Sequence, residues 1–126
     1  MFITNLIHSR TTSLQVRNDL KSSMEVSLSI EFSHAVDKKE DSRCNVIDRI
    51  TIADNGSDEE RLRIELVVES LFKFNEEAAG EIDGNLVHNE TLMQIYPHLR
   101  TLIASLTMTI GMSPLYISQD TLPYIK

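Results

Sequence analysis

Apolar and polar residues alternate along two long stretches of the chain, and a period of two is typical of strands with one buried face. From Glu25 to Val36, every second residue is apolar with few exceptions, and the residues between are mostly Ser and Glu. Alternation returns from Leu62 to Phe74, where the polar positions carry mostly Arg, Glu and Lys. We therefore predict two half-buried strands, the second of them bent near Ser70.

Two further segments favour extended structure. Residues Asn45–Ile52 are rich in β-branched side chains and stop at the turn-forming run Asp54–Ser57. Residues Ile3–Val16 are also β-prone, although they alternate less regularly. The charged run Asp37–Arg43 predicts an exposed turn. Short polar connections reverse the chain but cannot hold a crossover helix, so we expect a meander of four antiparallel strands.

The apolar period lengthens after Asn89. The next apolar residues follow the spacing of three and four that marks one helix face: Leu92, Ile95, Tyr96, Leu99, Leu102, Ile103, Leu106 and Ile110. Asn89 suits an N-cap, and Gly111 with Pro114 supplies a stop. Pro97 means that the helix is either kinked there or begins afresh there. An extended apolar segment, Met112–Ile117, follows.

These elements predict a single α+β domain over residues 1–126, in which the four-stranded antiparallel meander packs against one long C-terminal helix. The composition agrees with such a domain, because 41% hydrophobic and 25% charged residues are ordinary for a globular protein. A formal charge of −7 disfavours nucleic-acid binding. The first ten residues lack the apolar run of a secretion signal or membrane span, so we expect a cytoplasmic protein with no membrane insertion.

The residues give little support for catalysis or for a bound metal or cofactor. The histidines are scattered without the spacing of a metal site, and we expect structural roles for His8, His34, His88 and His98. The lone Cys44 is interpreted as an incidental thiol in a reducing compartment. The acidic cluster formed by Glu76, Glu77, Glu81 and Asp83 predicts a solvated loop more than a calcium site. The glycines do not have the spacing of a phosphate-binding loop. We therefore expect a protein that is not an enzyme and has no cofactor.

The order of these elements, together with three short motifs, resembles the SecB-like chaperones. Tyr96–Ile103 is similar to the aromatic-Pro signature that opens the main part of the family's long helix. Ser113–Ile117 resembles the Pro-x-Leu-x-Leu exit segment, and Ile64–Phe72 resembles the last strand of the fold. The resemblance extends roughly from Leu6 to Ile117, although the family's second helix looks short or absent here.

The resemblance implies a molecular chaperone that holds unfolded polypeptides, either preproteins for protein transport or one dedicated client, in an extended state without ATP. It also implies a homotetramer built as a dimer of dimers, with first strands pairing across subunits and clients lying in long apolar grooves. Local patterns place one set of apolar residues near such a groove. The predicted client-binding residues are Leu71, Phe72, Phe74, Met93, Tyr96, Leu115 and Tyr116.

In the family, acidic residues on the sheet surface dock the basic tail of SecA, the export motor. Glu65 matches one of them and Glu69 is a second candidate, but the matching first-strand positions are Thr11 and Gln15. We therefore expect SecA binding to be weak or absent. The alternative function is a dedicated protein-interaction module on the same fold, such as an antitoxin-specific chaperone or a phage-related protein. The number of unrelated clients that the protein holds would separate the two.

Overall fold

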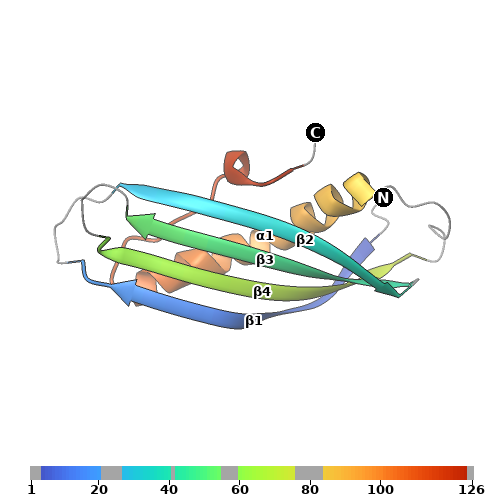
Figure 1. Ribbon diagram of the computed structural model, residues 1–126, viewed down its shortest axis with the longest axis horizontal. Helices are drawn as coiled ribbons and strands as arrows, with labels where there is room; N and C mark the ends of the chain where they lie inside the picture. Colours follow the sequence, from blue (N-terminus) through green and yellow to red (C-terminus); the bar gives the residue numbers. More distant parts are fainter. Residues whose placement is uncertain (1–3, 21–26, 41, 55–59, 76–83, 125–126) are drawn as a thin grey trace.

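The computed structural model describes residues 4–20, 27–40, 42–54, 60–75 and 84–124. Two layers make up the fold, a four-stranded antiparallel sheet and one long helix that lies along one of its faces (Figure 1). The elements are β1 (Thr4–Asn18), β2 (Leu28–Glu40), β3 (Arg43–Asp54), β4 (Leu62–Phe74), α1 (Gly84–Thr109) and a short 3₁₀ turn, η2 (Gln119–Thr121). The predicted α+β class, with four antiparallel strands and one long helix, is confirmed.

The strands are ordered β1-β4-β3-β2 across the sheet. Strands β2, β3 and β4 form the expected meander, but β1 pairs with β4 and not with its neighbour in sequence, from Thr4↔Phe74 to Asn18↔Leu62. This arrangement places β4, the strand with the strongest alternation, in the interior of the sheet. It leaves β1 and β2 as the two edges.

Two details of the strand predictions need correction. Strand β2 continues to Glu40 and β3 begins at Arg43, so most of the predicted turn over residues 37–43 is strand instead. An edge strand tolerates a charge such as that of the exposed Asp37, because one side of the strand faces water. The predicted change of side near Ser70 does not occur, because Ser70 is buried and the alternation of burial continues unbroken to Phe74. Register shifts occur in β1, after Leu6 and after Thr11, and in the β2–β3 pair between Asp37 and Glu40.

Helix α1 begins before the predicted cap at Asn89 and runs through Pro97 without a break. Its C-terminus is a Schellman motif, in which the Met112 N–H donates to the Thr107 carbonyl at 2.9 Å and the Gly111 N–H donates to the Met108 carbonyl at 3.0 Å. Gly111 takes the left-handed conformation that this motif needs, with φ of +93°. The predicted stop at Gly111 is confirmed.

The hydrophobic core lies between α1 and the face of the sheet that is turned toward it, called here the inner face. Its largest fully buried apolar side chains are Val46, Ile50, Ile52, Leu62, Ile64, Leu66, Phe72, Leu92, Ile95, Leu99 and Ile103. Strand β1 adds little, since Thr4 is its only buried residue. Among the described residues, no helix is long and apolar enough to cross a membrane.

Candidate peptide-binding site

A buried polar network joins the sheet to the helix. The His34 Nδ1 of β2 contacts the Asp48 carboxylate of β3, and its Nε2 lies 2.9 Å from the Thr91 hydroxyl of α1. The Thr91 hydroxyl also donates to the Val87 carbonyl, 2.8 Å away. His34 therefore joins β3 to α1 through both of its ring nitrogens.

The order Thr91, His34, Asp48 is that of a hydroxyl, imidazole and carboxylate relay, but its position excludes catalysis. The side chains of His34 and Asp48 are fully buried and Thr91 is 0% exposed, so no substrate reaches the hydroxyl. His34 therefore has the structural role predicted for it, which is to fasten β2 and β3 to α1. Cys44 is also buried, and this burial raises the pKa of its thiol, which makes it less reactive. The predicted acidic loop at residues 76–83 lies outside the described residues.

The seven predicted client-binding residues do not form the single patch that we expected. Phe72 and Phe74 lie in the core, 0% and 6% exposed, because alternation along β4 continues unchanged past Ser70. Leu71 is half-buried on the outer face of the sheet, where it pairs with His8 and Asn45. Phe72 and Phe74 thus belong to the core and Leu71 to the outer face, so none of the three lines a groove between sheet and helix.

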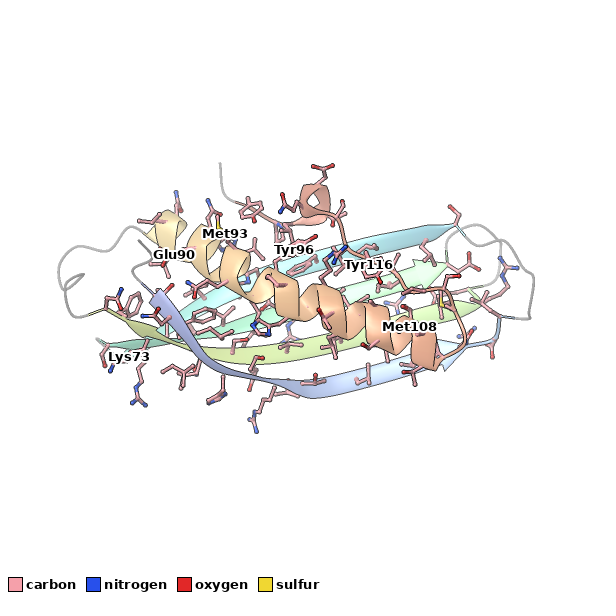
Figure 2. All side chains as sticks on the ribbon, turned by 180° about the vertical axis from the view of Figure 1, so that it is seen from behind. Lys73, Glu90, Met93, Tyr96, Met108 and Tyr116 are labelled. Atoms are coloured by element: carbon pink, nitrogen blue, oxygen red, sulfur yellow. The ribbon has the colours of Figure 1, made fainter. Side chains whose placement is uncertain are left out.

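The other predicted residues do gather, on α1 and on the C-terminal segment (residues 112–124) that folds back beside it. Met93 and Tyr116 are 51% and 54% exposed, and Figure 2 shows them near Tyr96 on the same side of the molecule. The Tyr96 hydroxyl donates to the Ile117 carbonyl, and the Arg100 guanidinium carbon lies 4.4 Å from the centre of the Tyr116 ring. These contacts join the helix and the C-terminal segment into one site.

This site contains a hollow of about 470 Å³. Its lining includes Met93, Tyr96, Pro97, Arg100, Gln119 and Tyr124. Pro97 has no N–H, so the helical hydrogen bond to the Met93 carbonyl is missing at this point of α1. The hollow thus combines adaptable apolar side chains with the cation of Arg100, a mixture that suits peptide binding more than chemistry. The described residues contain no cluster of His, Cys, Asp or Glu that could hold a metal ion.

A second surface, which the sequence did not reveal, lies between β1 and α1. It includes a hollow of about 250 Å³ lined by Ser9, Arg10, Thr11, Val68, Ile95, His98, Leu99 and Leu102. Nearby, Leu14 and Val16 pair with the core residues Leu66 and Ile64, yet they are 47% and 39% exposed because α1 does not cover this part of β1. The sequence predicted a strand here, but a strand pattern does not tell whether another element covers its face.

The predicted translocase contacts, Glu65 and Glu69, lie on the outer face of β4. Each already has an arginine partner, since Glu65 accepts from Arg63 at 2.9 Å and Glu69 lies 3.6 Å from Arg10. Gln15 stands directly opposite Glu65 on this face. Thr11, in contrast, pairs with the inner-facing Val68 and lines the hollow beside α1, so it lies away from the outer face.

A scan against protein-family models found no match, and a search of curated proteins found no relative. Among solved structures, the chain is similar to the Mycobacterium tuberculosis Rv1957 SecB-like chaperone in complex with a ChAD peptide from the Rv1956 HigA1 antitoxin. This similarity has a TM-score of 0.72 and 16% identity, and it covers 91% of this chain and 89% of that one. A protein of unknown function from Streptococcus agalactiae is similar at a TM-score of 0.49 and 8% identity, over 91% and 96% of the two chains. With the strand order and the long helix described above, the first of these similarities shows that this chain has a SecB-like fold.

Proposed function

We propose that this protein is a molecular chaperone, without enzymatic activity, that binds unfolded polypeptides in an extended state and does so without ATP. The observation that carries the proposal is the exposed apolar and aromatic site on α1 of a SecB-like fold. The M. tuberculosis protein of the same fold was solved with a bound peptide, which supports polypeptide as the ligand class here.

The side chains of the site suit this task. Methionine is flexible and polarisable, so Met93 can adapt to different client residues. Tyr96 offers a large contact area with a polar end that can bond to a peptide backbone. We retain Met93 and Tyr96 of α1 as the client-contact residues of the proposal, whereas the predicted residues Leu115 and Tyr116 belong to the C-terminal segment that contacts α1. Phe72 and Phe74 are omitted because they are buried, and Leu71 because it faces away from the site.

A dedicated interaction module is the second candidate function. The observation that favours it is the partner in the similar structure, a peptide from an antitoxin. A general chaperone should slow the aggregation of several unrelated unfolded proteins, whereas a dedicated module should act on one. Both candidates use the same surface, so the range of clients distinguishes them and mutation of the surface does not.

Docking on SecA, as part of protein transport in the cytoplasm, has weaker support. Glu65 and Glu69 are the acids predicted to meet a basic tail, and both are already paired with arginines of the same chain. Arg49 adds a further positive charge in the middle of the outer face, opposite Val67. A basic peptide would have to compete with these arginines, so we propose that SecA binding is weak or absent.

We also propose that the protein is a homo-oligomer, as a dimer of dimers. Strand β1 is an edge with unpaired backbone groups along one side, and its exposed apolar residues Ile7, Leu14 and Val16 would be covered by a second copy. The exposed face of α1 carries Leu86 and Met108, and its only exposed Lys, Arg, Asp or Glu among the described residues is Arg100. A long helix facing water usually carries more charge, which supports helix packing between copies.

The test compares Met93→Ala with the wild type in suppressing the aggregation of several unfolded model proteins. Met93 is half exposed, so its loss should lower the melting temperature little and weaken client holding. The matched control is Leu71→Ala, which truncates an apolar residue on the outer face and should leave client holding intact in the folded fraction. If Leu71→Ala loses client holding and Met93→Ala does not, the site is wrongly assigned. If the wild type holds no client, the proposed function is wrong.

A further inference from the structure

The C-terminal segment is bound to α1 by side chains of the helix that contact its backbone. The Thr107 hydroxyl accepts from the Leu115 N–H at 2.9 Å, the Tyr96 hydroxyl donates to the Ile117 carbonyl, and the His88 Nε2 lies 2.7 Å from the Pro123 carbonyl. These three residues are spread along one helix from its first turns to its last. A row of donors and acceptors aimed at a backbone can hold an extended chain of many different sequences.

The side chains of this segment alternate as those of a bound extended peptide would. Ile117 is 2% exposed and packs in the core, the neighbouring Tyr116 and Ser118 are exposed, and Leu115 is half-buried. Farther along, Leu122 is again buried, at 8% exposed. The burial of these apolar side chains shows that the surface beneath the segment is apolar and accepts Leu or Ile at alternate positions. The segment lies on the side of α1 that faces β2, away from β1 (Figure 1).

The segment joins no β-ladder. Before η2 it has no regular secondary structure, and none of its described residues pairs with a strand. Strand β1, in contrast, is paired with β4 from end to end. A segment held by side-chain contacts and two buried apolar residues can leave without breaking the sheet, and local openings of this kind cost less free energy than global unfolding.

From these observations we propose that residues 112–124 are a built-in occupant of the peptide-binding surface, which a client displaces. This inference rests on the proposed function and names its regulation and its ligand class. The ligand is an extended peptide with Leu or Ile at alternate positions. Its apolar side chains take the positions that Leu115 and Ile117 occupy while the segment is bound. Thr107, Tyr96 and His88 then bind the client backbone. A weakly apolar peptide cannot displace the segment, so the segment sets a lower limit on the hydrophobicity of clients.

The experiment uses a fluorescein-labelled synthetic copy of residues 112–124 as the probe and the full-length variant Ile117→Ser as the receptor. The polar serine weakens the hold of the segment on its own site, so the probe should bind this variant about tenfold or more tightly than it binds the wild type. The control Ser118→Ala alters an exposed neighbour and should bind the probe as the wild type does. Equal or weaker binding by Ile117→Ser, with its circular dichroism unchanged, would overturn the inference.

Hydrogen exchange on the wild type gives a second readout that does not depend on the variant folding. Adding reduced, carboxymethylated lactalbumin as an unfolded client should raise deuterium uptake in residues 112–124, while β3 and β4 stay protected. Binding of lactalbumin without such a rise would overturn the inference and leave the proposed function standing. Binding of lactalbumin by Ile117→Ser alone would overturn the inference, because the client would then be unable to displace the segment in the wild type. Binding of neither the probe nor lactalbumin by either protein would overturn both.

Discussion

His34 and Asp48 show how much of the stability of this fold depends on single polar residues. The pair is buried between sheet and helix, and Asp48 Oδ2 has no hydrogen-bond partner among the described residues. A buried polar group that loses its hydrogen-bond partner is strongly unfavourable, so each member of the pair is stable in the core only while the other is present. The pair therefore acts as a unit whose halves cannot be removed separately.

We predict that His34→Ala lowers the free energy of unfolding by about 1 to 3 kcal/mol, because it leaves the Asp48 carboxyl group and the Thr91 hydroxyl buried without their partner. Urea unfolding followed by circular dichroism measures the change. The double variant, His34→Leu with Asp48→Val, removes both polar groups and should recover much of this loss. As a control, His8→Ala on the exposed part of β1 should change stability by no more than about 0.5 kcal/mol. A double variant less stable than His34→Ala would contradict the view that the loss comes from unpaired buried groups.

At the scale of elements, the apolar period predicted strands β2, β3 and β4 and most of α1, because each of them buries one face. The start of α1 was placed too late, since the first turn carries the exposed Asn85 and Leu86 and shows no stripe. The candidate site was predicted in part. Met93, Tyr96 and Tyr116 come together through the return of the C-terminal segment, but the burial of Phe72 depends on unbroken alternation through Ser70, which the sequence left open.

The return of the C-terminal segment depends on how α1 ends. We predict that Gly111→Ala lowers stability by about 1 to 2 kcal/mol, because an alanine is strained at φ of +93°. No heavy atom lies within 4 Å of the added Cβ, so the loss is purely conformational. Thermal unfolding measures it. Gly84→Ala is the matched control, because its Cβ also has open space and its φ is ordinary, and it should be neutral or stabilising by up to about 1 kcal/mol. Equal effects at both positions would contradict the role of the left-handed turn.

At the scale of the whole molecule, the least predictable feature is the position of β1. Local pattern identified it as a strand, but its pairing with β4 joins residues far apart in sequence, and no periodicity records such a contact. Thr4 shows how the start of this strand is fixed. Its N–H donates to Glu90 Oε1 at 2.7 Å, and the Gln94 amide donates to its carbonyl at 3.0 Å. Beyond this anchor β1 is almost uncovered, which is the physical basis for expecting a second copy.

We predict that the wild type is a tetramer, or at least a dimer, at micromolar concentration, and that Leu14→Lys shifts it toward smaller species by placing a charge on the exposed apolar part of β1. Light scattering gives the mass of each species. Ser33→Lys is the control, because it adds the same charge at an exposed position of β2 and should leave the assembly unchanged. A wild-type mass of 14.3 kDa, that of one chain, would refute self-association.

The pairing of the first strand with the last also fixes an order of events during synthesis. Strands β2 and β3 are neighbours in sequence and can form a hairpin as soon as both have left the ribosome, whereas β1 is made first and has to wait until β4 emerges. The hydrogen bonds of Thr4 with Glu90 and Gln94 form later still, after α1 has been made. During that interval β1 is an unpaired strand of the nascent chain. The protein that we propose binds unfolded polypeptides therefore exposes an unpaired strand of its own while it is being synthesised.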